Sequence, residues 1–261
     1  MGSPGAGGAT NPAKYQEVMK SKIKAAAMEV RFQLACREQL VPLMWPYRIG
    51  RTRRRRRKVP GYDTRESYTN AEQKIIIDGF PGSANSYATE LFVDLQGDSF
   101  VFGHHFHSPA ETIRGMKMGI PVLLTLRHPV DAVCSMVRRW PFVKYERALV
   151  WYRMFYEAFE PYVDRITACD FSLLVSEFSQ VIHSLNDKHG TEFNGEVTDS
   201  MKETRKPRTN EDREKKRVEK DRLRRELEDS SSSMVIDQAV TTYERFLGRP
   251  EVLRARKGQT S

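Results

Sequence analysis

The sequence predicts an α/β fold in which helices flank a parallel β-sheet. Apolar segments of strand length alternate with amphipathic segments of helical length along the middle of the chain. One of these strands, residues 120–127, is apolar almost throughout, as is typical of a parallel strand covered on both faces. Before it, Ser108, Pro109 and Glu111 form a helix-start signal with a capping box. Regular alternation of strand and helix favours a parallel sheet.

The predicted elements of this core follow one another with short connections. We expect strands at 74–80, 98–105, 120–127 and 165–171, and helices at 86–95, 108–119, 129–140, 145–163 and 177–190. Gly190 ends the last of these helices. Together these elements predict one α/β domain over residues 71–248.

The segments outside this core differ from it in composition. Residues 1–13 are rich in Gly, Ala and Pro and predict disorder. Residues 14–70 predict a helix followed by a basic linker, and residues 249–261 a C-terminal tail. The helix begins near Tyr15, and we expect its apolar residues to pack on the domain; they are Val18, Ile23, Ala26, Ala27, Val30 and Leu34.

Two helices are expected near the end of the domain. The charged segment 202–229 predicts a surface helix with ion pairs of Glu211 with Lys215 and of Asp212 with Lys216. After a run of serines, residues 234–248 predict a final helix. Its docking residues are Val235, Ala239, Tyr243 and Phe246.

The charge of the chain is concentrated in one segment. The formal net charge is +9, and seven cations lie in Arg51–Lys58. This octet could contact nucleic acid or an acidic membrane surface, but we interpret it first as a solvated linker. No apolar run approaches the roughly 20 residues needed to span a bilayer. Three widely spaced cysteines and the lack of a secretory signal favour a cytoplasmic protein.

Three segments are expected at one edge of the sheet, because the carboxyl ends of parallel strands meet there. The first is the loop after the strand 74–80, where Gly82, Ser83 and Ala84 have little or no side chain. Backbone N–H groups of such a loop can surround an oxyanion at the start of a helix. The loop lacks the spacing and the lysine of a Walker A motif, which disfavours a conventional ATPase or GTPase.

A second segment supplies a cation at the same edge. Arg127 ends an apolar strand, and Ser135 lies in the helix that follows. An arginine there needs an anionic partner, and a guanidinium beside a hydroxyl suits a phosphate. The alternative is an ion pair between Arg127 and Asp131 that closes the helix start.

Together these segments resemble the sulfotransferases that use 3′-phosphoadenosine 5′-phosphosulfate (PAPS). The resemblance covers residues 73–193 and rests on two motifs. The family's loop motif is matched by Phe80, Pro81, Gly82, Ser83, Ala84, Asn85, Ser86 and Tyr87, and its Arg-x-Pro-x-Asp-x-x-x-Ser motif by Arg127, Pro129, Asp131 and Ser135. The resemblance implies a P-loop-like architecture, with the loop from Pro81 to Tyr87 on the 5′-phosphosulfate and Arg127 and Ser135 on the 3′-phosphate.

The loop departs from the family pattern at two positions. Gly82 replaces a basic residue, and Ala84 replaces a glycine. We expect a cation from Arg51–Lys58 or from residues 204–209 to take the place of that basic residue. We also expect that a lysine or arginine at position 82 would be accommodated. The resemblance also implies that Arg205, Lys206 or Arg208 closes over the nucleotide.

Histidines follow the second predicted strand. The resemblance places a catalytic base about 22 residues before the motif arginine, which is His105. If the segment is extended, His105 and His107 face one way and His104 the other, so His107 is the alternative base. His105 and His107 could instead bind a metal, but only Glu111 offers a third ligand nearby, so we expect no metal.

The sequence therefore predicts a PAPS-dependent sulfotransferase that acts on a hydroxyl or amine of a small molecule or glycan. One alternative is a nucleotide-binding relative without transfer activity, or a kinase-like phosphate-loop enzyme; another is a basic nucleic-acid-binding module. Trp140, Tyr152 and Phe193 could stack on the nucleotide or face the acceptor, although aromatic residues near a core more often pack. The identity of the acceptor stays open.

Overall fold

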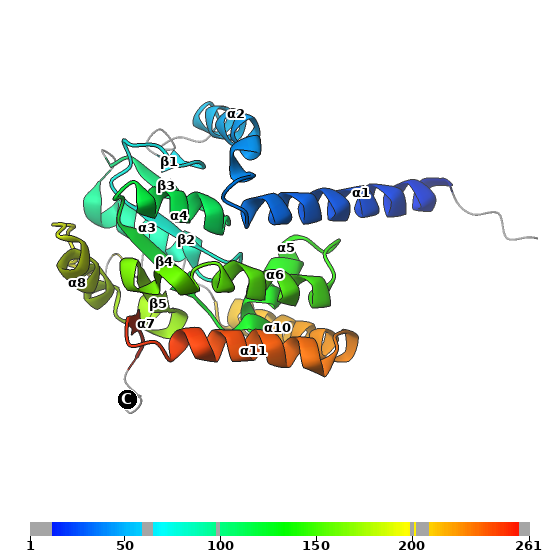
Figure 1. Cartoon of the computed structure of the whole chain (residues 1–261). Helices are drawn as coiled ribbons and strands as arrows, with labels where there is room; N and C mark the ends of the chain where they lie inside the picture. The colour runs from blue at the N-terminus through cyan, green and yellow to red at the C-terminus, as the bar shows by residue number, and fades with distance from the viewer. Residues whose placement is uncertain (1–11, 59–64, 98–99, 199–200, 202–208, 256–261) are drawn as a thin grey trace, which may run out of the picture.

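A central parallel sheet organises the molecule (Figure 1). The computed structural model describes residues 12–58, 65–97, 100–198, 201 and 209–255. Their strands are β1 (Arg65–Glu66), β2 (Ile76–Gly79), β3 (Phe102–His104), β4 (Val122–Leu126), β5 (Thr167–Asp170) and β6 (Val252–Leu253). They form one sheet in the order β1-β3-β2-β4-β5-β6, and every pair of neighbours is parallel. The α/β fold with a parallel sheet is confirmed.

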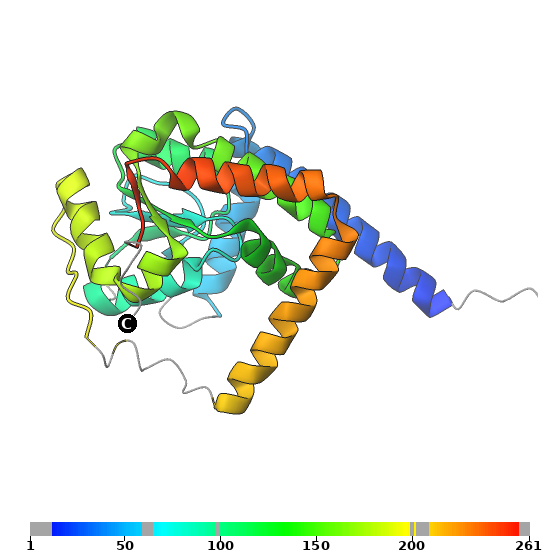
Figure 2. The same ribbon diagram turned by 90° about the horizontal axis from the view of Figure 1, so that it is seen from below.

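Helices connect these strands and cover both faces of the sheet (Figures 1 and 2). The helices are α1 (Pro12–Ala35), α2 (Trp45–Arg56), α3 (Asn85–Gln96), α4 (Pro109–Lys117), α5 (Pro129–Arg139), α6 (Tyr145–Glu157), α7 (Phe171–Ser176), α8 (Phe178–His189), α10 (Asn210–Ser230) and α11 (Ser233–Leu247). Two short 3₁₀ helices, η1 (Val41–Met44) and η2 (Glu160–Arg165), complete the list. The predicted helix 145–163 thus ends earlier than expected and continues as η2.

The central strands are buried on both faces because successive side chains enter different cores. Ile76 of β2 lies in the core formed with α4, α5, α6 and α11, whereas Ile75 and Ile77 lie in the core formed with α3, α7 and α8. In β4, Leu124 and Leu123 divide in the same way. This two-sided burial explains why the strand segments are apolar at consecutive positions.

The sheet extends beyond the predicted domain limits. β1, at residues 65–66, pairs with β3, and β6, at residues 252–253, pairs with β5. Both edge strands therefore lie outside residues 71–248. Each pairs over only two residues, and so short a segment carries no periodicity by which a sequence reading could find it.

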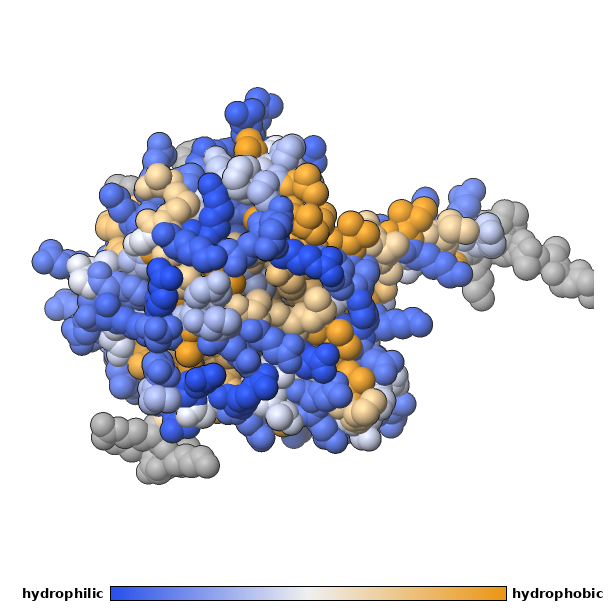
Figure 3. All heavy atoms as spheres, viewed as in Figure 1, coloured by the Kyte–Doolittle hydropathy of each residue, from blue (hydrophilic) through white to orange (hydrophobic). Residues whose placement is uncertain are grey.

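The helix α1 packs differently from our expectation. It projects from the body of the molecule, and Val18, Ile23 and Val30 are exposed (Figures 1 and 3). Only its C-terminal part enters the core, through Phe32 and Ala35. Among the described residues, no helix is both long enough and apolar enough to cross a bilayer.

The basic octet is not a linker, because most of it forms the second half of α2. Helical spacing divides its side chains among three directions. Thr52 is buried and accepts a hydrogen bond from the Ser67 backbone N–H, and Arg56 pairs with Glu66 of β1. Arg51 and Arg55, four residues apart, face a pocket described below. The remaining members, Arg53, Arg54, Arg57 and Lys58, are exposed.

The structure confirms the predicted cap of α4 but not the predicted capping box. The Ser108 hydroxyl caps α4 by accepting from the backbone N–H of Glu111. The Glu111 carboxylate does not complete a capping box, because it accepts from the Thr69 backbone N–H at 2.6 Å and from the Trp45 indole at 3.2 Å. It therefore fastens α2 and the segment after β1 to the core.

The two C-terminal helices lie where we expected them. In α10, Glu211 and Lys215 form the predicted ion pair at 2.7 Å, and Leu223 and Leu227 are buried. In α11, Ala239 and Phe246 are buried against the core. α10 packs on α5 and α6, which places it beside the carboxyl edge of the sheet (Figure 2).

Candidate functional site

The loop between β2 and α3 has an unusual backbone. Gly82 has φ +94° and Ala84, the residue before α3, has φ +67°. Both values lie in the left-handed region, which glycine adopts freely and alanine only at a cost of about 1–2 kcal/mol. The loop thus turns sharply into α3, and the amide groups of the first turn of α3 face the loop.

Two loop side chains that we expected on a phosphate are used inside the protein. The Asn85 amide donates to the carbonyl oxygens of Gly79 at 3.0 Å and Phe80 at 3.2 Å, and its oxygen accepts from Thr125 at 2.6 Å. Ser83 is fully buried, and its hydroxyl lies 3.2 Å from the Tyr156 hydroxyl. Neither side chain is directed to a ligand, so only their backbone groups are candidates.

Position 82 has no space for a basic side chain, which contradicts our expectation. A Cβ atom on Gly82 would lie 2.4 Å from the carbonyl oxygen of Ala132 and 3.0 Å from Cβ of Ser135. The loop is held against the first turns of α5 at this point. The missing cation is therefore a consequence of close packing between the two motifs.

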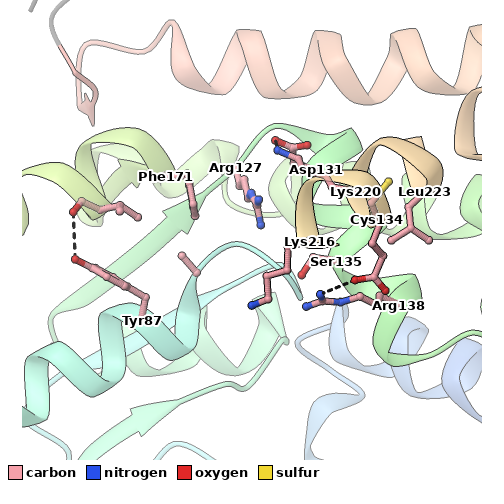
Figure 4. A pocket seen from close by; sticks show the side chains of 13 residues that line it. Tyr87, Arg127, Asp131, Cys134, Ser135, Arg138, Phe171, Lys216, Lys220 and Leu223 are labelled. Carbon is pink, nitrogen blue, oxygen red and sulfur yellow. Dashed lines mark hydrogen bonds and ion pairs between the residues drawn. The ribbon is translucent and has the colours of Figure 1, made fainter. Parts of the chain in front are cut away.

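One pocket of about 510 Å³ lies between α3, α5, α7 and α10 and brings both motifs together (Figure 4). Ala84 and Tyr87 line it from the loop side, and Arg127 and Ser135 from the β4–α5 side. Further lining residues are Asp131, Cys134, Arg138, Phe171, Val175, Lys216, Glu219, Lys220 and Leu223. We call it the motif pocket. Among the lining residues that the structure describes, four are cationic and two are acidic.

Arg127 occupies the centre of this arrangement. Its guanidinium donates to the Gly82 carbonyl oxygen at 2.8 Å and stacks on the Phe171 ring with 4.4 Å to the ring centroid. Burial lowers its pKa. Its Nε is buried and has no hydrogen-bond partner among the described residues. The side chain is thus fixed in place where it lines the motif pocket.

The alternative ion pair between Arg127 and Asp131 is not formed as a direct bond. Asp131 instead accepts from Arg224 of α10 at 3.0 Å and pairs with Lys220 at 3.3 Å. Burial raises the pKa of Asp131, but the bond to Arg224 and the charges of these cations outweigh it and hold the pKa below its ordinary value. The contacts fasten α10 to α5 across the motif pocket and leave Arg127 available.

Sequence reasoning missed the cations that α5 and α10 add. Arg138 lies one helical turn after Ser135 and pairs with Glu219 of α10 at 3.3 Å. Lys216 and Lys220 lie one turn apart in α10, and Lys216 extends toward the pocket as Arg127 does (Figure 4). Helical spacing from Ser135 would have identified Arg138. No local sequence pattern indicates that α10 lies over the pocket.

A second pocket, of about 340 Å³, lies on the other side of α3 and contains the histidines. It is lined by Arg31, Arg51, Arg55, Ser86, Thr89, Glu90, His104, His105, His107, Arg139 and Trp140, and we call it the histidine pocket. The Ser86 hydroxyl lies 3.0 Å from Nε2 of His105. This contact connects the first turn of α3 to the segment after β3.

The histidine segment is not extended, which corrects the expected alternation of its side chains. His105 has φ +52° and His107 φ +45°. The rings of neighbouring His104 and His105 meet through their Nδ1 atoms, although alternation would have separated them. Left-handed conformations at two non-glycine residues carry strain, and such strain clusters at functional sites. His104 is buried, as expected for a packing residue.

Two hydrogen bonds fix the position of His107. Its Nδ1 donates to the Gly79 carbonyl oxygen at 2.8 Å, and its backbone N–H donates to Asp78 at 2.9 Å. Burial lowers the pKa of His107 well below its ordinary value, which makes it a weak proton acceptor. It also faces a small cavity beside Pro81, which is itself buried.

The other predicted residues divide into three groups. Trp140 lines the histidine pocket, whereas Tyr152 and Phe193 are buried in the two cores and do not face either pocket. Arg205, Lys206 and Arg208 lie outside the described residues. In the part of the chain that the structure describes, no group of three or more His, Cys, Asp or Glu side chains is placed to hold a metal ion.

Comparisons with protein families, with characterised proteins and with solved structures find no match to this chain. Functional conclusions therefore depend on the two pockets and on the motifs that line them.

Proposed function

We propose that the protein transfers a sulfuryl group from PAPS to a hydroxyl or amine of an acceptor. The observation that carries this proposal is the motif pocket, which gathers Arg127, Ser135 and the loop residues Ala84 and Tyr87 around one cavity. These residues come from the two sequence motifs that resemble the PAPS-dependent sulfotransferases. They are separated by about 40 residues in the chain and meet only in the fold.

The donor nucleotide would occupy the motif pocket. Arg127 and Ser135 bind the 3′-phosphate, with Arg138, Lys216 and Lys220 adding positive charge. The ring of Tyr87 offers a flat surface for the adenine, whereas one face of the Phe171 ring is covered by the Arg127 guanidinium. Backbone N–H groups at the start of α3 bind the 5′-phosphosulfate, since these donors need no side-chain charge.

The acceptor would occupy the histidine pocket. The acceptor oxygen or nitrogen gives its proton to a base, forms a bond to sulfur, and the bond between sulfur and the bridging phosphate oxygen breaks. Adenosine 3′,5′-bisphosphate leaves with that electron pair. His105 is the proposed base, because it borders Ser86 of the loop, whereas the lowered pKa of His107 makes it a poor proton acceptor.

The leaving oxygen still requires a cation, and α2 is the candidate source. Arg51 and Arg55 line the same pocket as Ser86 and His105. A guanidinium near the bridging oxygen stabilises the negative charge that develops in the transition state. This arrangement would replace the basic residue that cannot fit at position 82.

Calorimetric titration with adenosine 3′,5′-bisphosphate, AMP, ATP and GTP tests the proposal. The bisphosphate should bind much more tightly than AMP, because only the bisphosphate carries the group bound by Arg127. Arg127→Ala should remove most of this difference, a loss of about 2–4 kcal/mol, as for a broken buried charge pair. Equal binding of AMP and the bisphosphate by the unaltered protein would contradict the proposal.

Two further variants separate binding from folding. Ser135→Ala removes a second contact without a charge change and should lower the affinity for the bisphosphate more than that for AMP. Arg153→Ala is the matched control, since Arg153 lies on α6 and bonds to Gln238 at 2.6 Å, outside the residues that line either pocket. It should leave all four titrations unchanged.

A nucleotide-binding protein without transfer activity is the second candidate, and the lack of a loop cation favours it. Release of bisphosphate from PAPS in the presence of hydroxyl and amine acceptors distinguishes the two. For a transferase, His105→Ala should lower turnover by about 10²–10⁴ and leave bisphosphate affinity nearly unchanged. The same loss in His107→Ala alone would assign the base to His107.

A further inference from the structure

The walls of the histidine pocket have a strong excess of positive charge. Arg31 comes from α1, Arg51 and Arg55 from α2, and Arg139 from the end of α5, whereas Glu90 is the one carboxylate among the lining residues that the structure describes. Arginines from three separate helices therefore converge on a single space of about 340 Å³. Convergence of several arginines on one space favours the entry of an anion.

Two of these arginines also lie near arginines that do not line the pocket. Partial burial and the neighbouring Arg48 lower the pKa of Arg31, and partial burial and the neighbouring Arg138 lower the pKa of Arg139, whose side chain is otherwise exposed. Among the described residues, neither Arg31 nor Arg139 has a carboxylate within ion-pair distance. A guanidinium that is partly removed from water and surrounded by like charge gains most from an incoming anion.

The two pockets divide neighbouring residues of α5 between them. Ser135 and Arg138 face the motif pocket, whereas Arg139 and Trp140 face the histidine pocket. Arg139 is thus not available to the nucleotide's 3′-phosphate in the motif pocket. Arg31 likewise lies with Pro81 and His107 on the side of the loop away from Arg127. The positive charge of Arg31 and Arg139 therefore lies at the histidine pocket.

We propose that the histidine pocket binds an acceptor that already carries an anionic group, a carboxylate or a phosphate or sulfate ester, and that Arg31 and Arg139 bind that group. The inference rests on the proposed function, because it treats the pocket as the acceptor site. The reacting hydroxyl or amine lies toward His105 and Ser86, and the anionic group lies toward α1 and the end of α5. The enzyme therefore selects acidic acceptors over neutral ones of the same shape.

The test measures binding with the motif pocket filled. The protein is saturated with adenosine 3′,5′-bisphosphate and titrated with p-nitrophenyl β-D-glucuronide and with p-nitrophenyl β-D-glucoside, which differ only at C6, a carboxylate in the first and a hydroxymethyl group in the second. A second set compares phenyl phosphate and phenyl sulfate with phenol, which stays neutral at the pH of the assay. We expect at least one anionic probe to bind about 10-fold or more tightly than its neutral counterpart, as for one charge-assisted hydrogen bond.

Adjacent variants on α5 provide the matched control. Arg139→Gln should abolish most of the preference for the anionic probe and leave bisphosphate affinity unchanged. Arg138→Gln should lower the affinity for the bisphosphate and leave the preference for the anionic probe unchanged, because Arg138 lines the motif pocket. Arg31→Gln should act as Arg139→Gln does.

The outcomes separate this inference from the proposed function. If no anionic probe binds more tightly than its neutral counterpart while the bisphosphate still binds more tightly than AMP, the acidic-acceptor inference is wrong and the donor site stands. A preference that survives both Arg31→Gln and Arg139→Gln also overturns it, since the anion is then bound elsewhere. Equal binding of AMP and the bisphosphate refutes the proposed function itself.

Discussion

Substitution of Gly82 by alanine tests how closely the two motifs pack. The new Cβ would lie 2.4 Å from the Ala132 carbonyl oxygen, which belongs to the backbone of α5 and has little freedom to move. Relief of this contact requires a shift of the loop or of α5, at a cost of about 1–3 kcal/mol for overpacking. The left-handed φ of +94° adds about 1–2 kcal/mol of backbone strain for a residue with a Cβ. We therefore expect Gly82→Ala to lower the free energy of unfolding by about 2–5 kcal/mol.

Gly119→Ala is the matched control for this substitution. Gly119 has a comparable φ of +81°, but apart from its two chain neighbours no heavy atom of the described residues lies within 4 Å of its added Cβ. It should therefore show only the strain of about 1–2 kcal/mol. The difference between the two variants isolates the contact with Ala132, at about 1–3 kcal/mol.

Urea unfolding followed by tryptophan fluorescence measures both variants. Equal losses for Gly82→Ala and Gly119→Ala would refute the close packing of the loop on α5, and with it our explanation for the missing loop cation. A second readout is available, because Ser135 lies 3.0 Å from the same added Cβ. Gly82→Ala should displace Ser135 and weaken bisphosphate binding, whereas Gly119→Ala should not.

Three further predictions concern groups that hold the site. Asn85→Ala leaves two backbone carbonyl groups and one hydroxyl without the amide that bonds to them, so urea unfolding should show a loss of about 3 kcal/mol; a loss below about 1 kcal/mol contradicts this role. Burial raises the pKa of Asp78 to about 6 from an ordinary 3.8, so its contribution to stability is present below pH 3.8 and is lost as the pH rises through about 6. The unfolding free energy of the unaltered protein minus that of Asp78→Asn should thus fall by about 2 kcal/mol between about pH 4 and pH 7, and a flat difference would show that the carboxyl is not buried in solution. Arg224→Ala removes a cation that compensates the Asp131 charge at the motif pocket. Calorimetry should therefore show a several-fold lower affinity for the bisphosphate, whereas the free energy of unfolding should change by less than about 1 kcal/mol. Unchanged affinity would mean that α10 does not shape the pocket.

Local sequence patterns determined the succession of elements. β2 and β4 lie in short, mostly apolar segments, and the helices that follow the strands carry start signals such as Ser108, whose hydroxyl caps α4. Hydrophobic periodicity and capping depend on residues close together in the chain, so a sequence can be read for them. The parallel sheet then follows from the alternation, because parallel neighbours need a helical crossover.

The sequence also determined which segments share an edge of the sheet. The loop at Gly82, the histidines after β3 and Arg127 after β4 all follow the carboxyl ends of strands, and in the structure the first two meet at Ser86 and His105, and the first and third at Gly82 and Arg127. Topology alone predicts this convergence. It does not predict the direction of a side chain within a loop.

Only the tertiary structure decided what these side chains do. Asn85 bonds to Thr125, which lies on another strand, and Gly82 is pressed against Ala132 of α5, so neither position is available for the role expected of it. The octet is largely helical and has a buried side, where the Thr52 hydroxyl accepts a hydrogen bond from Ser67 of the segment after β1. Contacts between residues so distant in the chain leave no local pattern, because each depends on the complete fold and not on neighbouring residues. The motifs could thus be recognised in the sequence, but their division between the motif pocket and the arginine-lined histidine pocket was set by the packing of α1, α2, α5 and α10.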